Sequence, residues 1–79
     1  MIRMDSQFTD SRLTRRQHEI VALVSAGLSN KAIGQKLNVT EGTVKLHLHT
    51  IYAKLGIPNR TKLALLAMQN SDGHLAAAS

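Results

Sequence analysis

The chain has 79 residues, no cysteine and a formal net charge of +5, with ten Lys and Arg against five Asp and Glu. A chain of this length forms one domain with a modest core, and without cysteine it has no disulfide, thiolate nucleophile or cysteine-ligated zinc. No apolar run reaches the roughly 18 residues of a membrane span, and no secretory signal is present. We therefore expect a cytoplasmic protein without a membrane partner.

The positive charge is concentrated in the central part of the chain. Residues 13–69 contain eight basic and two acidic residues, whereas the two ends together contain two basic and three acidic ones. A compact basic domain calls for a polyanionic partner, and nucleic acid is the commonest such partner. An anionic membrane would require a basic helix with bulky apolar residues on its opposite face, and the chain has a single Phe and no Trp.

The hydrophobic pattern predicts an all-α domain of four helices over residues 13–70, because Val and Ile never alternate with polar residues as they do in strands. Residues 1–12 mix charged and small polar residues without a period, and we interpret them as a flexible linker or N-terminal arm. Residues 71–79 are interpreted as a disordered tail.

Capping residues mark the first two helices. The first helix begins at Thr14, which forms a capping box with Gln17, and it ends at Gly27, which supplies a left-handed residue. The second helix begins after Ser29, a good N-cap, and runs to about Leu37.

Two residues of the second helix and its end are informative. Gly34 lies in mid-helix, where it costs about 1 kcal/mol relative to Ala, so we expect another helix to approach closely at that point. Asn38 tolerates a positive φ and is expected to turn the chain.

The third helix starts with Thr40 as N-cap and ends at Gly56, and Pro58 prevents any continuation. Its apolar residues form one stripe along a single face: Val44, Leu48, Ile51 and Leu55.

The fourth helix starts after Asn59 and runs from Arg60 to about Gln69, and it is apolar on two faces. One face is expected to serve the core and consists of Leu63, Leu66 and Ala67. The other consists of Thr61, Ala64, Leu65 and Met68. This second face indicates a further partner, unless the helix simply has a broad core stripe.

The second and third helices are separated by only a few residues in a short basic domain, which is the signature of a helix-turn-helix. The third helix is then the recognition helix, whose N-terminal half enters the major groove of DNA. A rotation of about 100° per residue places Lys45, Leu46 and His49 on its outer face. We predict that these three residues contact bases, because Lys donates to guanine, His donates to base acceptors and Leu contacts the thymine methyl.

A second set of residues is expected to contact the DNA backbone, and it consists of Asn30, Lys31, Thr40, Thr43, Lys54, Asn59 and Arg60. Free amides and the helix dipole attract an anion to the start of the second helix, and a phosphate there would explain a lysine that opposes its own helix dipole. Such contacts supply salt-dependent affinity without sequence discrimination.

The sequence contains no arrangement of residues that indicates catalysis. Asp5, Asp10 and Asp72 lie outside the predicted domain and no glycine-rich phosphate loop precedes a helix, so we exclude an enzyme and expect no cofactor. His47 and His49 project about 160° apart on a helix, so they cannot share a metal ion. A small-molecule ligand in this domain is not expected either.

The stretch from Leu13 to Met68 resembles the LuxR-type helix-turn-helix domain of bacterial transcription regulators, nearest to the response-regulator (NarL/FixJ-like) branch. The segments that carry the resemblance are GLSNKAIGQKL, TEGTVKLHLHTIYAKL and NRTKLA. The resemblance implies sequence-specific binding of double-stranded DNA, as the output domain of a two-component response regulator.

By position, the resemblance assigns base contacts to the same three residues, Lys45, Leu46 and His49. It also implies a homodimer on an operator with two half-sites, formed through the fourth helix by Thr61, Ala64, Leu65 and Met68. Two alternatives stay open at this stage: a dimer that forms only on DNA, and a module that docks on RNA polymerase.

The chain departs from the family pattern at several positions, which are Gln17, His18, Ala32, Gly34, His49 and Lys62. The family usually has acids in place of Gln17 and His18, and alanine in place of Gly34. His49 stands where a lysine is frequent, which leaves the base preference at that position open.

Overall fold

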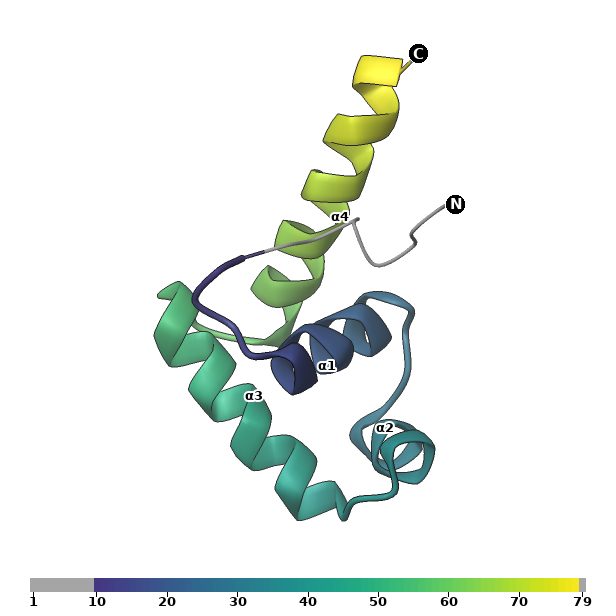
Figure 1. Ribbon diagram of the computed structural model, residues 1–79, viewed down its shortest axis with the longest axis vertical. Helices are drawn as coiled ribbons and strands as arrows, with labels where there is room; N and C mark the ends of the chain where they lie inside the picture. Colours follow the sequence, from purple (N-terminus) through teal and green to yellow (C-terminus); the bar gives the residue numbers. More distant parts are fainter. Residues whose placement is uncertain (1–9, 79) are drawn as a thin grey trace.

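A computed structural model describes the backbone of residues 10–78 and the side chains of residues 10–69. Within this part of the chain the order of elements is α1 (Arg15–Ser25), α2 (Asn30–Leu37), α3 (Glu41–Leu55) and α4 (Arg60–Ala78), and no strand is present. The predicted all-α class is confirmed. In Figure 1, α1 lies between α2 and α3, and the C-terminal part of α4 projects away from the other three helices.

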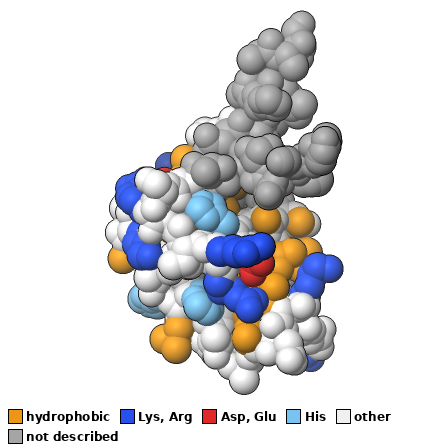
Figure 2. Space-filling view, viewed as in Figure 1, with side chains coloured by type: hydrophobic (Ala, Val, Ile, Leu, Met, Phe, Trp, Pro, Cys, Tyr) orange, Lys and Arg blue, Asp and Glu red, His pale blue; other side chains and the backbone are white. Residues whose placement is uncertain are grey.

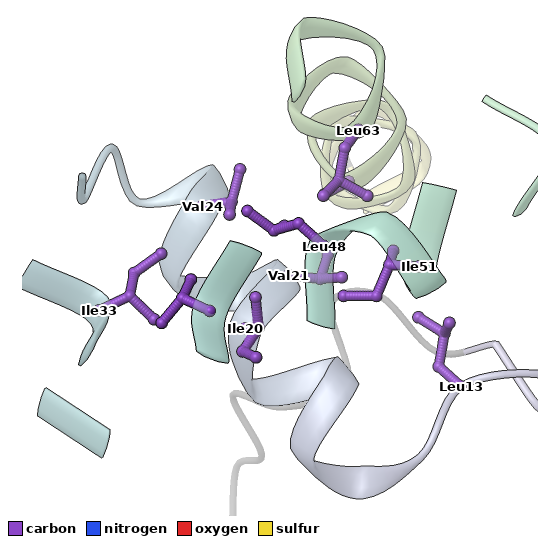
Figure 3. Close-up of a cluster of buried hydrophobic side chains, with 10 residues drawn as sticks. Leu13, Ile20, Val21, Val24, Ile33, Leu48, Ile51 and Leu63 are labelled. Carbon is purple, nitrogen blue, oxygen red and sulfur yellow. The ribbon is translucent and has the colours of Figure 1, made fainter. Parts of the chain in front are cut away.

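The core lies where the four helices meet. Its buried side chains are Leu13, Ile20, Val21, Val24, Ile33, Val44, Leu48, Ile51, Leu63 and Ala67. Figure 3 shows that side chains from all four helices point into this cluster. Full burial of one such aliphatic side chain contributes about 1.5–3 kcal/mol, so the cluster is the main source of stability. The predicted stripe of α3 is confirmed, although Leu55 at its end is only half-buried.

The predicted caps of α1 and α2 are confirmed. The hydroxyl of Thr14 accepts from the Gln17 amide at 3.1 Å, and the Gln17 side-chain oxygen accepts from the Thr14 amide at 2.9 Å, which completes the capping box. Ser29 accepts from the Ala32 amide at 3.1 Å. Asn38 ends α2 in the left-handed conformation with φ of 61°.

Gly34 is buried on α2, and the turn that follows α2 passes directly over it. A Cβ atom at this position would lie 2.7 Å from the Val39 carbonyl oxygen and 3.4 Å from the Thr40 carbonyl carbon. The expected close approach is therefore made by the backbone of the turn and not by the body of another helix. The glycine lets the turn fold back onto α2, and this fixes where α3 begins.

The start of α3 and the start of α4 also agree with the sequence. Thr40 accepts from the Thr43 amide at 3.1 Å, and Gly56 ends α3 with φ of 67°. The Asn59 side chain accepts from the Lys62 amide at 3.0 Å at the beginning of α4.

The predicted end of α4 near Gln69 is wrong, because the helical backbone continues to Ala78. The residues 71–78 are thus helical where a disordered tail was expected. No proline follows Gln69, and the three alanines 76–78 have the highest helix propensity of any residue, which outweighs Gly73.

Replacement of Gly34 by valine should destabilise the domain by about 1–3 kcal/mol, because its side chain would push against backbone atoms of the turn. Thermal and urea unfolding followed by circular dichroism measure this loss. Gln35→Val is the matched control, since Gln35 is exposed on the same helix and the change there should cost only a few tenths of a kcal/mol. Equal losses at the two positions would contradict the close approach.

Candidate nucleic-acid interface

The outer face of α3 presents three exposed side chains on neighbouring turns. Lys45, Leu46 and His49 are all exposed, and Leu46 is 70% exposed, the most of the large hydrophobic residues in the described part of the chain. The structure thus brings together the three residues that the sequence assigned to base contacts. Burial of Val44 and Leu48 on the opposite face of the same helix fixes this orientation.

Several basic and histidine side chains lie on the visible face over α1 and α3, among uncharged and hydrophobic ones, and few acidic side chains occur there (Figure 2). Within residues 10–69, the two ion pairs found are Arg12 with Asp10 at 2.7 Å and Arg16 with Glu19 at 3.6 Å. Most of the basic side chains of this part of the chain therefore remain available to an external polyanion.

The N-terminal end of α3 places two hydroxyls beside the exposed face. Thr40 donates its hydroxyl proton to the Thr43 hydroxyl oxygen at 2.9 Å while it accepts from the Thr43 amide. The Thr43 hydroxyl accepts in this bond, so its own proton is left to donate outward. Thr43 is half-buried and Thr40 is exposed.

The N-terminal ends of α2 and α4 are joined by polar bonds. The guanidinium of Arg60 donates to the Asn30 side-chain oxygen and to the Leu28 carbonyl oxygen. Arg60 and Asn30, which the sequence predicted to contact the DNA backbone, therefore also have a structural role, because they hold α4 against the start of α2. Lys31, by contrast, is exposed next to this junction.

The C-terminal end of α3 carries another candidate, Lys54, which is half-buried. Its ammonium donates to the side-chain oxygen of Gln17 on α1 at 3.0 Å. Asn59 is exposed and its side chain caps α4, as described above. The seven predicted backbone-contact residues thus lie at helix ends, whereas the three predicted base-contact residues lie on the middle of α3.

Two residues at this end of the domain were missed by the sequence reasoning. Arg12 donates to both carboxylate oxygens of Asp10, at 2.7 and 2.9 Å, and also to the Lys54 carbonyl oxygen at 3.0 Å. The Asp10 amide donates to the His18 ring at 2.9 Å. Residues 10–12 are therefore fixed to α1 and α3, whereas residues 1–9 of the predicted arm lie outside the described residues.

The second apolar face of α4 is largely exposed. Leu65 is 44% and Met68 is 47% exposed, and Thr61 is exposed beside them, while Ala64 is half-buried and packs against the core. Leu63 and Ala67 on the opposite side are buried, as predicted. The helix therefore does have two apolar faces, and nothing in residues 10–69 covers the second.

Two observations concern other kinds of site. In the described residues, no group of three or more His, Asp or Glu side chains could hold a metal ion, and His47 is half-buried while His49 is exposed. None of the helices in the same part of the chain has the length and apolar character needed to cross a membrane.

The short turn between α2 and α3, the exposed recognition face and the basic surface define a helix-turn-helix DNA-binding domain. Residues 11–67 match the bacterial regulatory proteins of the luxR family. The chain therefore belongs to the LuxR family, as its sequence predicted. The domain that defines this family is found in transcription regulators.

Similar proteins are transcription regulators of several bacteria. The chain is 44% identical over 57 residues to the transcriptional regulatory protein LnrK and 43% identical over 58 residues to the transcriptional regulatory protein LiaR, both of Bacillus subtilis (strain 168). It is 47% identical over 51 residues to the monoamine regulon transcriptional regulator of Klebsiella aerogenes.

These alignments cover 72%, 73% and 65% of this chain, but only 26%, 28% and 22% of the three relatives. The chain thus spans about a quarter of the length of the relatives that it matches.

The contacts of Asp10 predict a small, pH-dependent stabilisation. The side-chain hydrogen bond from Arg12, followed by its backbone amide, lowers the pKa of Asp10 from 3.8 to about 2. A carboxylate with a lowered pKa stabilises the fold above about pH 4, and this stabilisation is lost as the pH falls towards about 2. Asp10→Asn should therefore melt below the wild type at neutral pH, with a difference that shrinks through this window.

Arg12→Ala is the control for this measurement, because it removes the principal partner of the carboxylate. In that background, Asp10→Asn should have a smaller effect on the melting temperature, because only the bond from the backbone amide of residue 12 to the carboxylate remains. A difference of unchanged size would show that Asp10 does not act through Arg12.

Proposed function

We propose that this domain binds double-stranded DNA in a sequence-specific manner, with α3 in the major groove and its N-terminal half entering first. The observation that carries this proposal is the exposure of Lys45, Leu46 and His49 on one face of α3. Leu46 is 70% exposed, so on the free domain its apolar surface is in unfavourable contact with water. In the major groove the same side chain can contact a thymine methyl. Lys45 supplies donors for guanine, and His49 can donate to a base acceptor.

Backbone contacts would fix the position of α3 in the groove. Lys31 and the first amides of α2 present positive charge at one end of the helix-turn-helix, and Thr43 has a hydroxyl proton to donate at the start of α3. Lys54 lies at the other end of α3. Thr40, Asn30, Asn59 and Arg60 would add contacts from groups that also cap or join helices.

We further propose that two copies pair through α4 on an operator with two half-sites. Thr61, Leu65 and Met68 form a mainly apolar strip on α4, with Ala64 at its edge. No other residue of 10–69 packs over this strip. A two-fold axis would place the same strip of both copies in contact, and palindromic half-sites would match this symmetry. The strip of one short helix is small, so pairing is expected to depend on DNA.

The likeness to LnrK and LiaR, whose names describe transcriptional regulatory proteins, supports a role as an output domain that regulates transcription. Because the chain corresponds to about a quarter of those proteins, a response-regulator context within a two-component system, in the cytoplasm, is part of the proposal. RNA polymerase is the partner that such a regulator would contact from DNA. Selection of bound duplexes from a random-sequence pool would give the operator directly.

Lys45→Ala should weaken binding to the selected site by about 1–3 kcal/mol and relax the base preference at one position, because a base contact is lost. Lys31→Ala should weaken binding to all sequences alike, because it removes a phosphate contact and flattens the dependence on salt. Titrations by fluorescence anisotropy on the selected and on a scrambled duplex measure both effects. Lys31→Ala serves as the matched control, since it removes the same charge from another exposed position.

Equal affinity of the wild type for the selected and the scrambled duplex would refute sequence-specific binding. It would favour a domain that docks on a protein such as RNA polymerase instead. A Lys45→Ala variant with unchanged affinity and preference would refute only the base contact of Lys45.

Leu65→Asp should leave the free domain folded and abolish the pairing of two copies on DNA, because a charge would be buried in the apolar strip. Analytical ultracentrifugation with and without a duplex containing both half-sites measures the stoichiometry. Gln35→Asp carries the same change of charge at an exposed position on α2, one turn after Lys31, so it should weaken binding to DNA but still place two copies on one duplex. Two Leu65→Asp copies bound cooperatively to one duplex would contradict this interface.

A further inference from the structure

We propose that Gln17 is the positioning residue for Lys54: its neutral amide oxygen fixes the ammonium group at the C-terminal end of α3 and leaves the charge free for a DNA phosphate. This inference rests on the proposed function, since it takes Lys54 to contact the DNA backbone. It assigns to Gln17, a residue of α1, an effect on the affinity for DNA without any contact with DNA.

The position of the Gln17 side chain is fixed by its surroundings. Only 6% of the residue is exposed, and its side-chain oxygen accepts from the Thr14 amide at 2.9 Å within the capping box of α1. The same oxygen accepts from the Lys54 ammonium at 3.0 Å. A carbonyl oxygen has two lone pairs, so both are used, and the oxygen serves as a rigid anchor for the lysine.

The ammonium of Lys54 is held but not neutralised. Arg12, which binds the Lys54 carbonyl oxygen, has the Asp10 carboxylate as its partner. Lys54 has no carboxylate within ion-pair distance among residues 10–69, where its side chain is bonded to Gln17. At this end of α3, Arg12 is therefore paired with a carboxylate, whereas Lys54 is hydrogen-bonded to the neutral amide of Gln17.

Lys54 retains the capacity to bind a phosphate in this arrangement. An ammonium has three N–H donors, and the bond to Gln17 uses one of them. The side chain is half-buried, so its stem is ordered before DNA arrives and little rotamer freedom remains to be lost on binding. A glutamate at position 17 would provide the same anchor, but it would cancel the charge.

Gln17→Glu tests this inference, because it adds one negative charge next to Lys54 and preserves the capping box, which accepts either residue. We expect a melting temperature at or above that of the wild type. Affinity for a short duplex of arbitrary sequence should fall about fivefold, because the new carboxylate offsets the charge of the Lys54 ammonium and two unit charges about 4 Å apart in water interact by an amount equal to that factor. The slope of log K against log salt should become less steep by about 0.9, which corresponds to one phosphate contact.

Lys54→Met provides the matched background, because Gln17→Glu should have a clearly smaller effect when no ammonium is left for the new carboxylate to neutralise. The affinity and the salt slope of all four proteins are measured on the same duplex between about 50 and 200 mM salt. A merely structural role for Gln17 would change the melting temperature and leave the salt slope as it is. An equal effect of Gln17→Glu with and without Lys54, or an unchanged slope in the folded variant, would overturn the inference.

Gln17→Met is a second, independent variant, since it removes the anchor and leaves the charge of Lys54. Affinity should fall about threefold because the lysine must then be ordered on binding, and the salt slope should stay as in the wild type. Wild-type affinity in this variant would overturn the anchoring role. Failure of the wild type to bind duplex DNA in a salt-dependent way would instead refute the proposed function itself, so the two failures are distinct.

Discussion

The burial of one face of α3 is the constraint on which the rest of the structure depends. Val44 and Ile51 are completely buried and Leu48 is nearly so, in a cluster built from all four helices. Because the side chains of a helix project at fixed angles, burial of this stripe leaves the opposite side of α3 in water. The exposure of Lys45 and Leu46 is therefore a consequence of core packing. No additional interaction is needed to keep these two side chains on the outer face of α3.

Local signals made most of the fold predictable. Caps such as Thr14 with Gln17, Ser29 and Asn38 act within three or four residues, and a helical period reveals which face is buried. The exposure of Lys45, Leu46 and His49 could be predicted from the same period, because it depends only on which face of α3 is buried. The length of α4 was not predictable in the same way, because the Asp-Gly pair at 72–73 resembles a turn while the following alanines favour a helix.

Bonds between distant residues could not be predicted from the sequence. Arg12 binds a carbonyl 42 residues away, Lys54 binds a side chain 37 residues away, and Arg60 binds Asn30 across 30 residues. No period or motif links such pairs, because their geometry exists only after the helices have packed. The sequence therefore identified Lys54 and Arg60 as basic residues at helix ends but gave no sign that both are engaged within the domain.

The bonds that Lys54 and Arg60 make within the domain affect how these residues could also bind the DNA backbone. A guanidinium has five N–H donors and an ammonium has three, so Arg60 and Lys54 can hold the helices together and still bind a phosphate. Internal bonds order both basic side chains in the free domain, and in the proposed complex this would reduce the entropy lost on binding. An alanine at either position would remove a structural bond and a charge together. Changing the partner is the sharper approach, because Gln17 can be altered in charge while Lys54 itself, and every atom it could present to DNA, stays in place.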